Sequence, residues 1–212
     1  LHERWQTRHR PVPPEVAWAQ AHYRRFLIAD GSTLDALLRK LKLLADGTHV
    51  ALAGRMLALL DGASRLPVQL WFESNPAAHD QRFWPPVESA LRAGDLLLFD
   101  LGFTHFGMFA EITDMGVVFI TRAKTNLAFT VETKIFTCTN VRDWRVTVGT
   151  GAATQSLRLV QVRYRGKWYR YLTNELDTAV LPTAYVVALY WQRWRIEDAY
   201  ALAKRLLGLA YV

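Results

Sequence analysis

Short apolar runs that end at an aspartate stand out in the first half of the chain. Residues 26–29 are Phe, Leu, Ile and Ala and precede Asp30, and residues 96–99 are Leu, Leu, Leu and Phe and precede Asp100. Uninterrupted apolar runs of this length are typical of strands buried on both faces of a sheet. The pattern therefore predicts two buried strands, each of which delivers an aspartate at its carboxyl end.

The stretches around these runs carry other periodicities. Apolar residues at helical spacing predict three helices, at residues 34–44, 83–91 and 105–115. Asp80 is placed to cap the second of them. Residues 49–73 have an extended pattern with turn residues at 61–64, which predicts an antiparallel hairpin. A further apolar run at 117–120 follows the third helix, so strands 96–99 and 117–120 are expected to be parallel neighbours.

The second half of the chain changes character. Residues from about 126 to 172 show extended stretches separated by Gly149, Gly151 and Gly166, without a helical period, and a long helix is expected from Pro182 to Leu207.

This pattern predicts three parts. Residues 1–25, which are basic and rich in proline, are expected to be a linker. Residues 26–125 and 182–212 would form an α/β domain, and residues 126–181 a β-rich insertion before the last helix.

Composition narrows the class of protein. The chain has 212 residues, of which 51% are hydrophobic, and a formal net charge of +7, which favours an anionic partner such as nucleic acid. Cys138 is the single cysteine, so a disulfide within the chain and a multi-cysteine zinc site are excluded, and a reducing, cytoplasmic location is expected. Apolar runs fall short of the roughly 18 residues of a membrane helix, so no membrane partner is expected.

The last expected helix gathers reactive side chains on one face. Tyr190, Arg193, Glu197 and Lys204 stand at helical spacings that place them within an arc of about 60°. Two structural interpretations remain open for this face. Arg193 and Glu197 could form a surface ion pair of the common i, i+4 kind, and Tyr190 could be a packed core aromatic.

These residues carry a resemblance to a known family. The spacing Tyr190, Arg193, Glu197, Lys204 resembles the Tyr-Arg-Glu-Lys signature of DDE transposases of bacterial insertion sequences, in the group called insertion sequence family four. Residues 28–34 look like the first-aspartate motif of that family, and residues 94–103 look like its second-aspartate motif, although Leu101 replaces a common arginine. The resemblance covers roughly residues 26–207.

The resemblance implies a ribonuclease H-like fold, a mixed five-stranded sheet flanked by helices. It further implies that Asp30, Asp100 and Glu197 are the catalytic carboxylates and the ligands of two metal ions. A set of metal ligands that consists of carboxylate oxygens, with no His or Cys, favours Mg²⁺ or Mn²⁺. Such a pair of ions supports in-line displacement at phosphorus.

The implied activity is endonuclease cleavage of DNA and strand transfer at transposon ends. The transfer would proceed either through a DNA hairpin or directly. The implied location is the bacterial cytoplasm, in association with the nucleoid. The implied partners are double-stranded DNA, both transposon ends and target, and further copies of the chain that together pair two ends. Tyr190, Arg193 and Lys204 would then contact DNA phosphates.

The insertion contains a second candidate DNA-binding surface. Its basic residues alternate with aromatic ones, and no acidic residue interrupts them between Arg158 and Tyr171. The proposed DNA contacts are Arg163, Arg165, Lys167 and Trp168, with Trp168 a candidate for stacking on an unpaired base. A twisted hairpin with a solvated cationic face is an equally good interpretation.

Two alternative functions remain at this stage. A truncated or domesticated relative would bind DNA without cleaving it, and its charge pattern would be the same. A nuclease or resolvase of another ribonuclease H-like group gives no reason for the spacing of Tyr190, Arg193, Glu197 and Lys204, and is disfavoured for that reason.

Overall fold

The computed structural model describes residues 12–33, 55–73, 80–100 and 106–193. Its strands are β1 (Phe26–Thr33), β2 (Arg55–Asp61), β3 (Pro67–Glu73), β4 (Leu96–Phe99), β5 (Val118–Arg122), β6 (Phe129–Thr137), β7 (Val141–Val148), β8 (Gln155–Tyr164) and β9 (Lys167–Thr173). Its helices are α2 (Pro14–His22), α4 (Trp84–Ala90), α5 (Phe106–Asp114) and α6 (Thr183–Gln192), with the short 3₁₀ helices η1 (Asp80–Phe83) and η3 (Gly151–Ala153).

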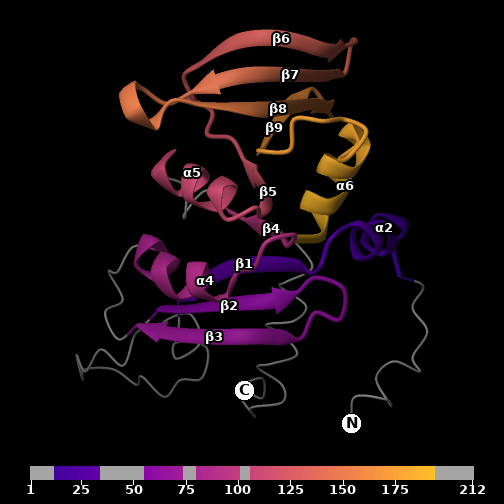
Figure 1. Ribbon diagram of the computed structural model, residues 1–212. Coiled ribbons are helices and arrows are strands. Elements are labelled where there is room, and N and C mark those ends of the chain that lie inside the picture. Colours follow the sequence, from indigo (N-terminus) through magenta and orange to yellow (C-terminus); the bar gives the residue numbers. More distant parts are fainter. Residues whose placement is uncertain (1–11, 34–54, 74–79, 101–105, 194–212) are drawn as a thin grey trace, which may run out of the picture.

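All these strands belong to one sheet, in the order β3-β2-β1-β4-β5-β9-β8-β7-β6 (Figure 1). Strand β4 is parallel to β1 and to β5, and the other pairs are antiparallel. The mixed α/β class, the hairpin β2–β3 and the parallel pair β4–β5 are therefore confirmed.

The expected count of five strands is wrong, because the sheet formed by the described residues has nine. Strands β3-β2-β1-β4-β5 are five consecutive strands of this sheet, but β5 is not an edge strand. Strand β9 pairs antiparallel with β5, with Thr173 opposite Ile120, so strands β6–β9 extend the same sheet. The physical reason is that an unpaired β5 would leave backbone N–H and C=O groups open, and β9 satisfies them.

Helices cover the sheet on both faces, which explains the uninterrupted apolar runs. Leu27 and Ala29 of β1 pack on the face covered by α4 and α5, whereas Phe26 and Ile28 pack on the face covered by α2 and α6 (Figure 1). Successive side chains of a strand point to opposite faces. A strand in the middle of such a sheet therefore needs an apolar residue at every position.

Strand β1 is longer than the apolar run predicts. Its pairing with β4 stops at Ala29, opposite Phe99, but its pairing with β2 continues as far as Thr33, opposite Arg55. Asp30 therefore lies within strand β1, just past the last residue paired with β4, and the expectation that the strand ends there is wrong. The hydrogen bonds of β2, not side-chain hydrophobicity, keep the chain extended beyond this point.

Two helices differ from their sequence expectations. Pro14–His22, within the stretch expected to be a linker, is the helix α2, and its Val16 and Ala19 are buried. Asp80 lies in the 3₁₀ helix η1, and the N-cap position of α4 is Phe83; α4 begins at Trp84 with prolines in its first turn. Proline fits these first positions because their N–H groups have no partner within the helix.

Several sequence predictions lie outside the described residues. These are the helix at 34–44, the residues Leu101, Glu197 and Lys204, and the last helix beyond Arg193. Within the described ranges no helix is long and apolar enough to cross a membrane.

Candidate active site at the ends of strands β1 and β4

The parallel pairing of β1 and β4 brings two aspartates to one place. Ala29 and Phe99 are the last paired residues of the two strands, so Asp30 and Asp100 follow at the same level on neighbouring strands. Both carboxylates keep contact with solvent, with side chains 19% and 38% exposed. This register places the aspartates of the two sequence motifs side by side.

Arg193, just past the end of α6, joins the two carboxylates. Its Nη1 donates a hydrogen bond to Oδ1 of Asp30 at 3.1 Å, and its Nη2 lies 3.5 Å from Oδ2 of Asp100. Burial works to lower the pKa of Arg193, but interactions with Tyr190, Asp100 and Asp30 together outweigh it and raise this pKa. A permanent positive charge thus lies between the two aspartates.

Tyr190, one helical turn earlier, contacts the same site. Its hydroxyl donates a hydrogen bond of 3.1 Å to Oδ1 of Asp100, and its ring is buried against Tyr171 with ring centroids 5.0 Å apart. Burial is the main cause that raises the pKa of Tyr190, and the nearby Arg193 opposes it. The phenol therefore stays protonated and acts as a donor, not as a base.

A buried threonine supports the end of β4. The hydroxyl of Thr121, on β5, donates a 2.9 Å hydrogen bond to the carbonyl of Phe99, the residue that precedes Asp100. Thr121 is fully buried, so this bond is shielded from water. It fixes the backbone from which Asp100 projects.

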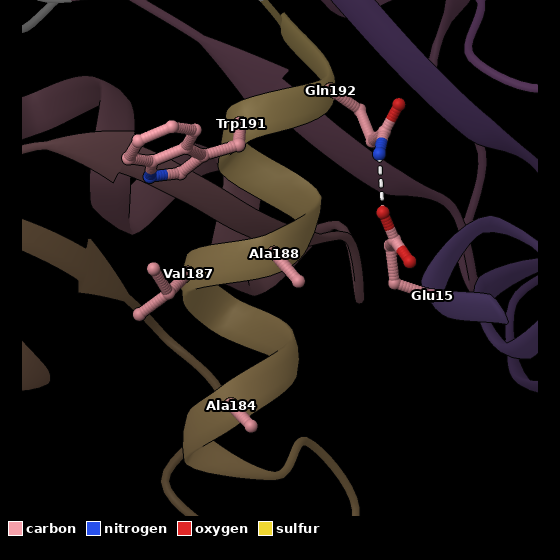
Figure 2. Close-up of a pocket in the computed structure, with 6 residues that line it drawn as sticks. All are labelled: Glu15, Ala184, Val187, Ala188, Trp191 and Gln192. Atoms are coloured by element: carbon pink, nitrogen blue, oxygen red, sulfur yellow. Dashed lines mark hydrogen bonds between the residues drawn. The ribbon is translucent and has the colours of Figure 1, made fainter. Parts of the chain in front are cut away.

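Helix α6 is also tied to α2 next to the site. Figure 2 shows the side chains of Glu15 and Gln192 facing each other between the two helices, where Gln192 donates a hydrogen bond to Glu15. A cavity of about 400 Å³ opens here, lined by Glu15, Ala184, Val187, Ala188, Trp191 and Gln192. Glu15 is the one ionisable residue in this lining, so the cavity has no pair of carboxylates like that of Asp30 and Asp100.

Strand β9 carries basic side chains beyond the same edge of the sheet. Thr121 of β5 lies opposite Phe99 on one side and Leu172 on the other, and Arg122 lies opposite Tyr171. Residues 167–170 of β9 therefore continue past the level of Asp100. At about 3.3 Å per residue, these four residues carry β9 roughly 13 Å beyond the aspartates.

The expected DNA contacts of the insertion lie on this hairpin, and not all are equally accessible. Arg163, Arg165 and Lys167 are exposed. Trp168 is half-buried, and the guanidinium carbon of Arg142 lies 4.3 Å from the centroid of its ring. One face of the Trp168 indole is thus already covered by a cation.

Arg158 does not belong to this exposed set, although the sequence pattern groups it there. It is fully buried and forms a bidentate ion pair with Asp143, which is also fully buried. Sequence reasoning missed Asp143 and its partner Thr183, because an ion pair across strands leaves no local spacing signal. The one hint in the sequence is the position of Asp143, a charged residue within a strand of which half the residues are apolar.

Of the residues assigned to the site from sequence, the structure brings together Asp30, Asp100, Tyr190 and Arg193. Glu197 and Lys204 lie outside the described residues. In the parts that the structure describes, no group of three or more His, Cys, Asp or Glu residues forms a metal cluster.

Comparison with known proteins agrees with this geometry. The family described as the transposase DDE domain matches residues 24–210, so the chain belongs to the DDE transposase family. No curated protein sequence matches it.

A cryo-EM structure of the piggyBac transposase synaptic complex with hairpin DNA is similar in fold, with a TM-score of 0.54 and 10% identity. The similarity covers 85% of this chain and 40% of that chain, so the chain spans less than half the length of that protein. At this identity the likeness is one of fold.

Proposed function

We propose that the chain is the catalytic part of a cut-and-paste DNA transposase, which cleaves DNA strands at transposon ends and transfers them to target DNA with the help of divalent metal ions. The observation that carries this proposal is the pair Asp30 and Asp100 at adjoining positions of two parallel strands, with Arg193 between them. Membership of the DDE family supports it. We further propose the group with the Tyr-Arg-Glu-Lys signature, with Glu197 as the third carboxylate and Lys204 as a phosphate contact.

The residues present fit a hard divalent cation. Asp30 and Asp100 offer carboxylate oxygens, the preferred ligands of Mg²⁺ and Mn²⁺. Both carboxylates already accept a shared cationic partner in Arg193. When two such ions are bound, they lower the barrier to in-line displacement by stabilising the attacking and the leaving oxygen.

The side chains of the site have distinct tasks in this proposal. Asp30 and Asp100 hold the ions, and Tyr190 orients Asp100 through its hydroxyl while remaining protonated. In the absence of bound metal ions, the positive charge of Arg193 compensates the negative charge of the two carboxylates. Its planar guanidinium also suits bidentate binding of a phosphate, so it is available to the DNA backbone once the ions are in place.

The hairpin β8–β9 supplies the proposed DNA surface. Arg163, Arg165 and Lys167 are exposed and project past the edge that holds the aspartates, which suits a duplex end entering the site. Stacking of an unpaired base on Trp168 requires either its free face or displacement of Arg142. The structural alternative, a solvated cationic hairpin, predicts no loss of DNA affinity when these residues are neutralised.

Transposon ends must be brought together for strand transfer, so we propose that several copies of the chain act as an assembly. The similar piggyBac structure is a synaptic complex with hairpin DNA, which supports both an assembly and a hairpin route for this chain. Direct strand transfer is the competing route. The two routes differ in one product, the hairpin-ended element.

A cleavage assay tests the proposal. The chain is incubated with Mg²⁺ and labelled DNA that carries the ends flanking its coding region, and compared with Asp30→Asn, Asp100→Asn and Glu197→Gln. The control is Asp114→Asn, which changes an exposed aspartate at the end of α5. We expect cleavage by the parent and the control, and loss of cleavage in the other three variants.

Two outcomes separate the alternatives. Binding of the ends without cleavage by the parent chain would support a domesticated DNA-binding protein. Cleavage that is equal in all variants would show that the aspartate pair is not the active site.

A further inference from the structure

A buried polar network joins the insertion to the helix that carries Tyr190 and Arg193. Asp143 of β7 and Arg158 of β8 are both fully buried and lie on the sheet face that α6 covers. Nε of Arg158 donates a 2.8 Å hydrogen bond to Oδ1 of Asp143, and its Nη2 bonds to Oδ2 of the same carboxylate. The pair thus has bidentate geometry in a site that excludes water.

The remaining hydrogen bonds of this pair all go to the start of α6. Nη1 of Arg158 donates to the carbonyl of Leu181 at 2.6 Å, and Nη2 donates to the hydroxyl of Thr183 at 3.0 Å. The hydroxyl of Thr183 in turn donates to Oδ2 of Asp143 at 2.6 Å. The N-cap residue of α6 is Pro182, which has no side-chain acceptor, so the start of the helix is anchored by this network and not by a capping side chain.

The net contribution of a buried ion-pair network to the stability of the folded protein is small. Removing two charges from water costs several kcal/mol for each ion, and apolar residues of similar volume often serve equally well. Its donors and acceptors do, however, have strict requirements of distance and angle. A side chain that must satisfy a carboxylate, a carbonyl and a hydroxyl at once permits little movement of the helix to which it is bonded.

The same face of α6 that meets this network also meets the aspartates. Thr183 and Tyr190 are seven residues apart, which is close to two full turns, so both project in nearly the same direction. Arg193 follows one turn later. A displacement of α6 by about 1 Å in the direction of the 3.1 Å hydrogen bonds of Tyr190 and Arg193 would lengthen them beyond hydrogen-bond distance.

We propose that Asp143, Arg158 and Thr183 are positioning residues, whose buried network sets the height and rotation of α6 over the candidate active site. The insertion is then a structural support for catalysis as well as a surface for DNA. This inference rests on the proposed function, because it takes the aspartate pair to be the site that α6 serves.

The chain contains a matched ion pair for comparison. Arg25 and Asp95 also form a bidentate pair, with a 2.9 Å bond from Nε to Oδ1, and Nη2 of Arg25 donates to the carbonyl of Ala90. Asp95 is fully buried. This second pair ties the residue before β1 to the loop before β4, and its further side-chain hydrogen bonds among the described residues go to the backbone of Ala90 and Arg92 and not to α6.

The test follows the environment of Tyr190 by ¹⁹F NMR in the full chain with its tyrosines replaced by 3-fluorotyrosine. The resonance that is missing in Tyr190→Phe belongs to Tyr190. We expect Thr183→Val, which removes the hydroxyl and keeps the shape, to shift this resonance. Thr183→Ser, which keeps the hydroxyl, should leave the resonance at its parental position.

Two controls separate positioning from a general effect on the fold. Thr113→Val removes a threonine hydroxyl of α5, on the opposite face of the sheet, which donates to the Phe109 carbonyl and accepts from Asn174, and it should leave the Tyr190 resonance unmoved. The double variant Asp143→Leu/Arg158→Met should shift the resonance, whereas Asp95→Leu/Arg25→Met should not. These double variants keep the proposal testable if Thr183→Val does not fold.

The proposal is overturned if the resonance stays in place in folded Thr183→Val, or if it moves equally in the serine variant or the controls. Addition of Mn²⁺ tests the proposed function separately, because a paramagnetic ion at Asp30 and Asp100 must broaden the nearby Tyr190 resonance. Failure of this broadening in the parent chain would count against the metal site. The response to Thr183→Val would still decide the positioning role.

Discussion

The two halves of the sheet differ in how far their strands are buried. In the core half, β3-β2-β1-β4-β5, the central strands are buried on both faces, and all four residues of β4 are inaccessible to water. In the outer half, β9-β8-β7-β6, burial declines toward the edge until nearly every residue of β6 is exposed. The acids of the candidate site belong to the core half, and the exposed arginines and lysines to the outer half.

This difference indicates a division of tasks. Carboxylates that hold metal ions need a rigid base, and two fully packed strands provide it. A surface for the DNA backbone needs accessible positive charge, which an exposed antiparallel hairpin provides. Helix α6 connects the halves, because it bonds to Arg158 at its start and to the aspartates at its end.

The largest expected change in stability comes from the one arginine of the outer half that is buried like a core residue. Arg158→Met leaves the Asp143 carboxylate buried without its ionic partner, which costs about 3–5 kcal/mol of unfolding free energy. Arg163→Met, on an exposed position of the same strand, should change it by less than about 0.5 kcal/mol. Urea unfolding measures both, and equal effects would contradict the distinction between these arginines.

A truncation in each half measures the difference in packing. Leu98→Ala in β4 removes a fully buried side chain and should cost about 2–5 kcal/mol of unfolding free energy. Ile135→Ala in β6 removes a side chain that is 38% exposed, and should cost under about 1 kcal/mol. Thermal or urea unfolding of the two variants should therefore separate clearly. A larger loss at Ile135 would show that β6 is covered in solution.

Tyr190→Phe tests the contact between α6 and the core half. Loss of the hydrogen bond to Asp100 should cost about 0.5–1.5 kcal/mol at neutral pH. Burial raises the pKa of Tyr190 above its ordinary value near 10, so the unfolded chain loses this proton first as the pH rises. The parent should therefore lose stability above about pH 10 more steeply than Tyr190→Phe, and parallel pH profiles would argue against a buried phenol.

The smallest effect per residue is expected for the basic hairpin. Arg163→Gln, Arg165→Gln and Lys167→Gln should each reduce the slope of log affinity against log salt by about 0.9 if each side chain neutralises one DNA phosphate. Fluorescence anisotropy with a labelled duplex measures this slope. Unchanged slopes would favour a solvated cationic face with no DNA contact.

The core half was predictable from sequence because each of its elements has a local signal. The apolar run of β4 matches its observed bounds, and the turn after Asp61 correctly indicates the hairpin β2–β3. The positions of Asp30 and Asp100 on neighbouring strands followed from the motifs of the resembled family, and the register agrees.

The outer half was less predictable because its structure depends on contacts between distant residues. The pairing of β9 with β5 joins positions about 50 residues apart, and no local pattern in the sequence indicates that strands β6–β9 continue the same sheet. The burial of Arg158 depends on Asp143 and on the start of α6, and no spacing within β8 indicates it. The extension of β1 beyond Asp30 similarly depends on its partner β2.

The central claim is that Asp30 and Asp100 together hold a divalent cation, and Mn²⁺ binding tests it most directly. Free Mn²⁺ is measured by EPR during titration of the parent chain, Asp30→Asn, Asp100→Asn and the exposed control Asp114→Asn. The account predicts saturable binding in the parent and the control, and affinity more than about tenfold weaker in the other two variants. Equal affinity in all four proteins would contradict it.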